Sequence, residues 1–410
     1  MYRKRSLQSK RGGFAISIVL CAVILMLIIG VGVLSLGMHG RTLAVRTSSG
    51  IAARSAADAG LTKALFEMNQ QLEAKTWNAT SLPSVSDEPL PNCDSIFSYN
   101  VAKSTTADGN DLYTMECTGT SGRFRKTVNC TLELKGIFEY AIYVADTLDL
   151  KNGTTITAYN QKPGDHPLQI GTNSTASGAI TAKLGVIIDG DVVVGVGGDA
   201  DTVIDSKAEA AISGKSYPSL IKNKTPAIKV PKALLEMPSS GTITESTTIS
   251  SSAKYDGVNL LGTDPNANGS SIITIDGKVE IYVLGDIILG NGDEIQILPG
   301  SSLTIYLGGN LTVDNGGAIN NLTKDAKALK IYGLDTCTSI DFKNSADFYG
   351  AIYAPEADIL LRNGAQVYGA MVGKTFTQDV SGHFHYDMSL REVDPSEIGV
   401  HMVIKRWSEE

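Results

Sequence analysis

A short phrase that recurs along this chain constrains its fold more than any other feature. Each copy begins with Ile-Tyr, continues as an alternating apolar stretch and ends with Asn-Gly. The copies are IYVADTLDLKNG at 142–153, IYVLGDIILGNG at 281–292, IYLGGNLTVDNG at 305–316 and, with one inserted residue, IYAPEADILLRNG at 352–364. The later copies and their shorter echoes start roughly 17 to 26 residues apart, which is too short for a propeller blade and suits one turn of a solenoid. Strand-like alternation predicts a parallel β-helix (β-solenoid).

The residue types of the phrase suit stacked coils. Coils of a parallel β-helix lie about 4.8 Å apart, so that like residues stand above like. Gly supplies a corner with positive φ, and Asn tolerates that conformation well. A single Asn-Gly would predict a two-residue hairpin, but four copies at one offset from Ile-Tyr favour a corner. The tyrosines of the phrase (Tyr143, Tyr282, Tyr306 and Tyr353) are expected to stack in the coil wall rather than to form a sugar platform.

The charge of the chain is unevenly distributed. The net charge is −8, yet residues 1–75 carry ten Lys or Arg against three Asp or Glu. An acidic, aromatic-poor body excludes nucleic acid as the expected partner, and a membrane explains the basic end. No cofactor is predicted.

The N-terminal region predicts a membrane helix. A basic head at 1–11 precedes an uncharged apolar run at 12–40, long enough to span the hydrocarbon core of about 30 Å. A cleaved secretory signal would have a shorter apolar region and an A-x-A-like site. The excess of positive charge before the span predicts a cytoplasmic N-terminus and a periplasmic or extracellular body.

An amphipathic helix is expected to continue over 41–75. Its apolar stripe is Leu61, Leu65, Met68 and Leu72, and Gly50 and Gly60 are weak points in it.

Two stretches of this region carry a resemblance to a known family. Arg11-Gly12 before the apolar run, and Ala56-Ala57-Asp58-Ala59-Gly60-Leu61 after it, resemble the PilX-type N-terminal region of type IV fimbrial biogenesis proteins. The resemblance implies a minor-pilin-like protein of a type IV pilus or type II secretion-like system, with the cytoplasmic membrane and pilin-like or secretion subunits as partners. It also implies a processing site between Gly13 and Phe14. Major pilins carry Glu at the place that Ile18 would then occupy.

A small pilin-like antiparallel meander is expected next, in 76–135. Residues 76–92 contain three prolines and predict a linker; alternating runs at 96–102, 111–118 and 124–134 predict strands separated by turn sequences. The meander needs the amphipathic helix to cover its apolar face. Three cysteines lie in or beside it, and an exported body allows disulfides. Cys117–Cys130 is the favoured pair, with Cys93–Cys117 and Cys93–Cys130 as alternatives.

The remainder divides into two solenoid parts. The first is expected at 136–215 and the second at 241–390; a proline-containing excursion at 216–240 lies across the solenoid or joins the two parts, and 391–410 is a polar tail. The second part, with Tyr349-Gly350-Ala351-Ile352-Tyr353-Ala354-Pro355, resembles uncharacterised bacterial β-helical domains found behind PilX-like N-termini. This resemblance implies an envelope location and no known activity.

Two groups of side chains are weak metal candidates. Asp189 and Asp191 share a face, and GGDADTVID with Asp199 and Asp201 resembles a calcium turn. His383 and His385 alternate on one strand and could converge on a metal. For the aspartates the alternative is that they are solvated carboxylates at corners. For the histidines it is that they form a polar cap on the last coil.

The sequence therefore predicts a mainly β, non-enzymatic envelope protein that uses its β-helix for scaffolding or adhesion. Its ligand could then be an envelope polysaccharide. The alternative function is that of an envelope-tethered, carbohydrate-active β-helix enzyme. The enzyme would need carboxylates and basic residues on one face of successive coils.

Overall fold

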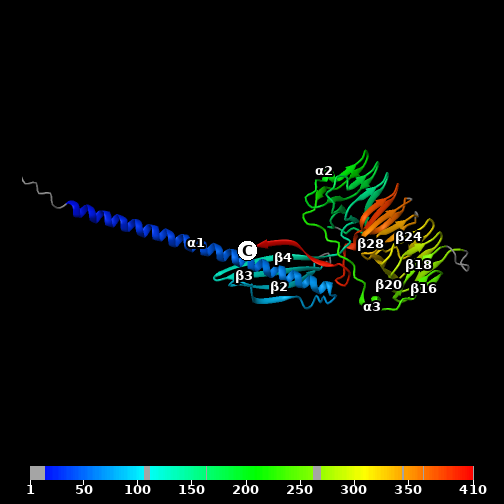
Figure 1. Cartoon of the computed structure of the whole chain (residues 1–410), viewed down its shortest axis with the longest axis horizontal. Helices are drawn as coiled ribbons and strands as arrows, with labels where there is room; N and C mark the ends of the chain where they lie inside the picture. The colour runs from blue at the N-terminus through cyan, green and yellow to red at the C-terminus, as the bar shows by residue number, and fades with distance from the viewer. Residues whose placement is uncertain are drawn as a thin grey trace, which may run out of the picture. The chain divides into compact units, whose positions relative to one another are not determined.

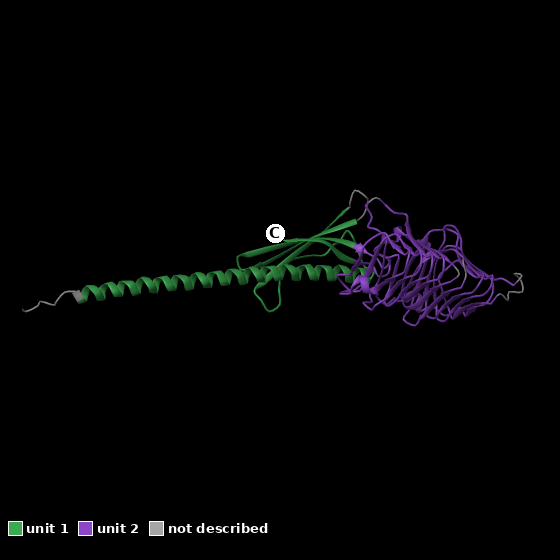
Figure 2. Ribbon diagram, turned by 90° about the horizontal axis from the view of Figure 1, so that it is seen from above, with its two compact units in different colours: residues 1–133, 402–410 green, residues 134–401 purple. Residues whose placement is uncertain are grey.

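The protein consists of two compact units (Figure 2). The computed structural model describes residues 14–105, 111–162, 164–261, 269–343, 346–362 and 364–409. Unit 1 is Met1–Glu133 with Met402–Glu410, and unit 2 is Leu134–His401. The predicted basic head at 1–11, together with Gly12 and Gly13, lies outside the described residues.

One uninterrupted helix begins unit 1. Helix α1 (Phe14–Glu73) contains no proline and runs for 60 residues. The large apolar side chains from Ile16 to Ile51 are at least half exposed, whereas one face of the later turns is buried. The buried residues of that face are Ala53, Ala56, Ala57, Leu61, Ala64, Met68 and Leu72. Three residues of the predicted stripe are therefore buried, and alanines complete the face in place of the half-buried Leu65.

A five-stranded sheet completes unit 1, and α1 lies along one of its faces (Figure 1). Its strands, in spatial order, are β1 (Ser84–Pro89), β2 (Ser95–Thr105), β3 (Asp111–Ser121), β4 (Phe124–Lys135) and β31 (His401–Glu409). The pairs β1–β2, β2–β3 and β3–β4 are antiparallel, so the predicted meander is confirmed. Two assignments were wrong: the linker at 76–92 contains β1, and the tail at 391–410 contains β31. Both are edge strands, whose polar, partly exposed sequences carry little alternation.

The helix approaches the sheet most closely at β3. A Cβ on Gly119 would lie 2.0 Å from the carbonyl oxygen of Ala53 and 2.4 Å from the nitrogen of Ala57, so two backbones touch there. One turn further on, a Cβ on Gly60 would lie 3.0 Å from the Phe97 ring. Gly60 is thus a packing position rather than the weak point that was expected. A Cβ on Gly50, by contrast, would meet no atom within 4 Å beyond its own stretch of helix.

Unit 2 is built from parallel strands arranged in three columns (Figure 1). The chain adds one strand to each of the three columns in turn and then repeats. One such round of three strands is called a pass. A 22-stranded sheet and a four-stranded sheet contain all of these strands.

The first column, from one end of the stack to the other, contains β17 (Ala253–Tyr255), β20 (Lys278–Val283), β23 (Ser302–Leu307), β26 (Leu329–Gly333), part of β28 (Phe348–Leu361), part of β29 (Gln366–Gln378), β5 (Ile142–Val144), β8 (Gln169–Thr172), β11 (Asp191–Val194) and β14 (Ser216–Pro218).

The second column contains β15 (Thr242–Ile243), β18 (Gly257–Leu260), β21 (Ile287–Leu289), β24 (Leu311–Val313), β27 (Ser339–Phe342), the ends of β28 and β29, β6 (Leu148–Leu150), β9 (Ile180–Ala182) and β12 (Ile204–Ser206).

The third column contains the four-stranded sheet β16 (Thr247–Ile249), β19 (Ile272–Ile275), β22 (Glu294–Ile297) and β25 (Ala318–Asn321). It also contains the starts of β28 and β29, then β30 (His383–Asp387), β7 (Thr155–Tyr159), β10 (Ile187–Ile188) and β13 (Ala211–Ile212). Four short helices lie between strands: α2 (Ala200–Val203), α3 (Lys232–Leu235), η1 (Ala326–Ala328) and η2 (Met388–Arg391).

The order of strands in the stack differs from their order in the sequence. Ile142 and Tyr143 pair with Met371 and Val372, so the first copy of the repeated phrase stacks on the last passes. The chain enters the stack in its middle and runs to one end at β14. Residues 219–241 then carry it to the other end at β15, and it returns until β30 pairs with β7. The predicted solenoid parts, 136–215 and 241–390, therefore meet at the end of the second part, and 216–240 connects the two outer ends.

The glycines of the Asn-Gly pairs lie at corners, as predicted. Gly153, Gly292, Gly316 and Gly364 have φ values of 72°, 85°, 83° and 67°. Each is the third residue of a four-residue turn closed by a backbone hydrogen bond from the fourth N–H to the first carbonyl, with N···O distances of 2.9–3.2 Å. The same turn recurs with Gly185, Ser381 and Glu209 in the third place, at φ values of 67°, 58° and 63°.

Alternate strand residues form the core of unit 2. Val283 and Leu307 are fully buried and in register, so this position of the repeated phrase faces the core. Tyr282, Tyr306, Tyr332 and Tyr353 are also in register, on the opposite face of the same strands. Tyr143, in the first copy of the phrase, departs from this row, because it pairs with Val372 and Gly171.

Candidate functional site

The exposed half of α1 is the clearest functional element. Within Ala15–Glu73 an 18-residue window has a mean hydropathy of 3.1 and is 0% buried. Crossing a bilayer takes about 20 apolar residues, so the helix is long and apolar enough to span a membrane. Arg41 is the first charged residue after its start. Phe14, half of the predicted processing site, begins the helix, and Ile18 is a 58% exposed residue on it.

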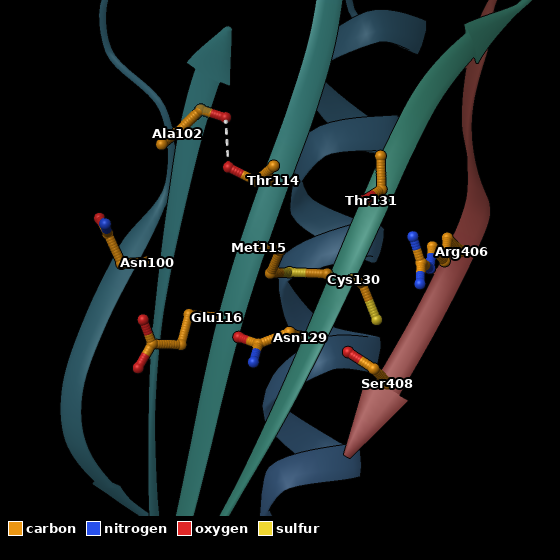
Figure 3. A pocket seen from close by; sticks show the side chains of 10 residues that line it. All are labelled: Asn100, Ala102, Thr114, Met115, Glu116, Asn129, Cys130, Thr131, Arg406 and Ser408. Atoms are coloured by element: carbon orange, nitrogen blue, oxygen red, sulfur yellow. Dashed lines mark hydrogen bonds between the residues drawn. The ribbon is translucent and has the colours of Figure 1, made fainter. Parts of the chain in front are cut away.

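The sheet face opposite α1 carries a shallow hollow of about 350 Å³ (Figure 3). Four strands line it, with the residues Asn100, Ala102, Thr114, Met115, Glu116, Asn129, Cys130, Thr131, Arg406 and Ser408. Thr114 Oγ1 donates to the carbonyl oxygen of Ala102 at 3.5 Å. Amides, hydroxyls, one guanidinium and one carboxylate can hydrogen-bond a polar surface, but these ten residues contain no base beside a reactive nucleophile. Arg406 and Ser408 were not among the predicted site residues, because the sequence of β31 predicts a polar tail.

The cysteines of unit 1 do not pair. Cys117 faces Val128 across β3–β4, and Cys130 faces Met115, so the two cysteines are diagonal neighbours. All five cysteines of the chain are free thiols. The expected Cys117–Cys130 disulfide and both alternatives with Cys93 are therefore wrong. Burial raises the pKa of Cys117 to about 12 and that of Cys130 to about 11, which makes both thiols unreactive.

The aspartates proposed as metal ligands satisfy separate local groups. Asp189 Oδ1 accepts from Ser213 Oγ at 2.7 Å, and Asp191 Oδ1 accepts from the N–H of Lys215 at 2.8 Å. Asp199 caps α2, accepting from the N–H of Asp201 and from Thr202 Oγ1. Among the described residues no three His, Cys, Asp or Glu side chains form a group that could hold a metal ion.

The two histidines lie inside the stack rather than at its end. β30 pairs with β29 on one side and with β7 on the other, so the expected polar cap is wrong. His383 Nδ1 and His385 Nδ1 form hydrogen bonds with Thr155 Oγ1 and Thr157 Oγ1, at 2.6 and 2.8 Å. Burial lowers the pKa of His385, and the neighbouring His383 lowers it further. The pair thus joins two segments that are distant in sequence.

An aromatic row extends from this pair. The ring centroids of Tyr349 and Tyr368 lie 4.3 Å apart, and those of Tyr368 and His385 lie 4.6 Å apart, with nearly parallel planes. Because the rings cover one another's faces, a sugar that needs an open ring face would meet mainly ring edges.

Three tyrosines of the first column are buried, and the proline-containing segment contacts one of them, Tyr353. Tyr306, Tyr332 and Tyr353 are each at most 3% exposed, and the Tyr306 and Tyr332 rings lie 5.7 Å apart. Tyr353 Oη donates to the carbonyl oxygen of Pro226 at 2.9 Å. Asn173 Nδ2 donates to the carbonyl oxygen of Asn223 at the same distance. These tyrosines serve packing, as the stacking interpretation predicted.

Comparisons with known proteins assign no activity. Residues 257–393 match a domain of unknown function (DUF7305), and no curated protein matches the chain. Among solved structures, the competence-associated pilin ComZ from Thermus thermophilus is 12% identical with a TM-score of 0.27, covering 88% of this chain and 97% of that one. An ice-binding protein from an Antarctic Flavobacteriaceae bacterium is 9% identical with a TM-score of 0.22, covering 60% and 96%. Both TM-scores are too low to establish a shared fold.

Proposed function

We propose that this chain is a membrane-anchored, non-enzymatic structural protein of the cell envelope. Its N-terminus lies in the cytoplasm, α1 crosses the membrane once, and the body lies in the periplasm or outside the cell. The three parallel columns of unit 2 close into a β-helix, which the protein presents for scaffolding or adhesion.

The division of α1 into two halves carries this proposal. A water-soluble protein rarely leaves so many large apolar side chains uncovered, and the bilayer is the solvent that removes this cost. The later half buries its alanine-rich face on an antiparallel sheet. One rigid helix therefore connects the bilayer directly to a folded unit.

A structural role fits the side chains outside α1 better than catalysis does. The aspartates and histidines that were candidate metal ligands form separate hydrogen bonds within turns and between strands. A glycosidase-type site would require two carboxylates flanking one cleft.

The resemblance of the N-terminal region to PilX-type proteins points to a type IV pilus or type II secretion-like machine. We favour an accessory protein that keeps its basic head and stays in the membrane. Lysine and arginine residues on an anionic leaflet contribute about 1 kcal/mol each, and Ile18 offers no charge to position the helix on a neighbour.

Mass spectrometry of the N-terminal peptide tests the proposal. The protein is isolated from carbonate-washed membranes and from sheared surface fibres. We expect the intact head in the membrane fraction. A mature end at Phe14 in the fibres would make the chain a fibre subunit. An end beyond residue 40 would show that the apolar segment is a removed signal and would refute the anchor.

A further inference from the structure

Three apolar side chains are uncovered at one end of the stack in unit 2. Leu220 and Ile221, directly after β14, are 94% and 76% exposed. On the neighbouring pass, Val196 follows β11, whose Val194 pairs with Pro218, and its side chain is 47% exposed. Two consecutive aliphatic residues this exposed are costly in water, and apolar patches on a protein surface are common sites of contact.

The same segment is basic in an acidic protein. Residues 210–235 contain five lysines and no Asp or Glu, whereas the whole chain has a net charge of −8. These lysines are Lys215, Lys222, Lys224, Lys229 and Lys232. Lys222 and Lys224 follow the aliphatic pair directly and are exposed. The exposed carboxylates of the neighbouring pass are Asp189, Asp199 and Asp201. Asp189 accepts a hydrogen bond from Ser213 Oγ, and Asp199 caps α2.

We propose that this tip, defined as Val196 with Leu220–Lys224, binds an anionic lipid bilayer. Aliphatic side chains that enter the boundary between headgroups and acyl chains, with lysines beside them at the headgroups, are the usual composition of an interfacial membrane contact. The inference deepens the proposed function, on which it rests for the presence of a nearby bilayer. It gives the envelope protein a second lipid contact, in unit 2, besides α1.

The test places a tryptophan at the tip. Full-length Ile221→Trp protein is reconstituted into vesicles of brominated lipid, with or without phosphatidylglycerol. Native tryptophans, Trp77 and Trp407, both belong to unit 1, and the wild-type protein gives their background. We expect bromine to lower the added emission about twofold or more in anionic vesicles only, because lysines must draw the tip to the surface. Lys222→Gln with Lys224→Gln in the same protein should remove the quenching, and so should high salt.

Two controls separate the tip from the anchor. Carbonate washing of the same vesicles reports on α1: loss of the protein would count against the proposed function, whereas retention without quenching at residue 221 would overturn the tip alone. Leu220→Ser with Ile221→Ser should keep the circular dichroism of the wild type and its carbonate resistance. Cross-linking of residue 221 to a second copy in detergent, with no quenching by lipid, would identify a protein contact and overturn the proposal.

Discussion

Gly119→Ala should destabilise unit 1 through a clash between two backbones. The added methyl group would lie 2.0 Å from the carbonyl oxygen of Ala53, and neither atom can rotate away. The helix must withdraw by about 1 Å, a gap at which contacts lose a quarter to a half of their dispersion energy. Overpacking usually lowers the free energy of unfolding by about 1–3 kcal/mol. Because the clash here is between two backbones, which cannot change rotamer, we expect a loss of about 3 kcal/mol. With a urea slope of about 2 kcal/mol per M, the midpoint falls by about 1.5 M.

Tryptophan fluorescence isolates this effect. Both tryptophans lie in unit 1, and the Trp77 ring packs edge-on against Tyr113 with centroids 5.6 Å apart. Urea unfolding of the full chain in detergent is followed by this emission, while circular dichroism follows the strands of both units. Gly50→Ala is the matched control: it adds the same methyl group to open space and should stabilise the helix by at most about 1 kcal/mol. If the Gly119→Ala midpoint equals that of wild type, the close approach is not a structural requirement.

Three further predictions concern other sites. Val283→Asp should abolish cooperative unfolding of unit 2 in circular dichroism, because it buries an unpaired charge that costs several kcal/mol; Ile288→Asp, on the outer face of the second column, should leave it nearly unchanged. Ser381→Gly should stabilise unit 2 by about 0.5 kcal/mol, because Ser381 has a φ of 58°, a left-handed conformation that costs serine more than glycine. This gain exceeds the backbone entropy that the more flexible glycine loses on folding; a lower melting temperature of the variant would contradict the prediction. Iodoacetamide at pH 8 should modify exposed Cys93 in the native protein but not Cys117, whose raised pKa keeps it protonated; equal labelling would refute the burial.

Local patterns in the sequence predicted local structure well. The Ile-Tyr to Asn-Gly phrase predicted the corner glycines and the tyrosine row of the later copies, because each depends on neighbours within one or two passes. Tyr143 of the first copy does not join that row. The helix stripe and the three-stranded meander followed from periodicity in the same way. The packing role of Gly60 depended on a partner, Phe97, that helix propensity alone does not include.

Long-range pairing was the part that could not be predicted. Residues 142–144 look like the start of a stack, yet they pair with 371–373, because stacked passes offer similar apolar surfaces and sequence order does not determine which surfaces meet. For the same reason His383 and His385 appeared to end the stack. The strand β31, and with it the Arg406 edge of the hollow, was missed because an exposed edge strand needs little alternation.

The insertion of unit 2 between β4 and β31 has a consequence for the order of folding. β4 and β31 are neighbours in one sheet, but residues 136–400 separate them in the chain. During synthesis the edge of β4 stays open until residues 401–409 have been made, and an open edge invites pairing with other chains. Completion of the five-stranded sheet thus waits until all of unit 2 has been made, and deletion of residues 401–409 would disturb a unit whose other strands come before unit 2 in the sequence.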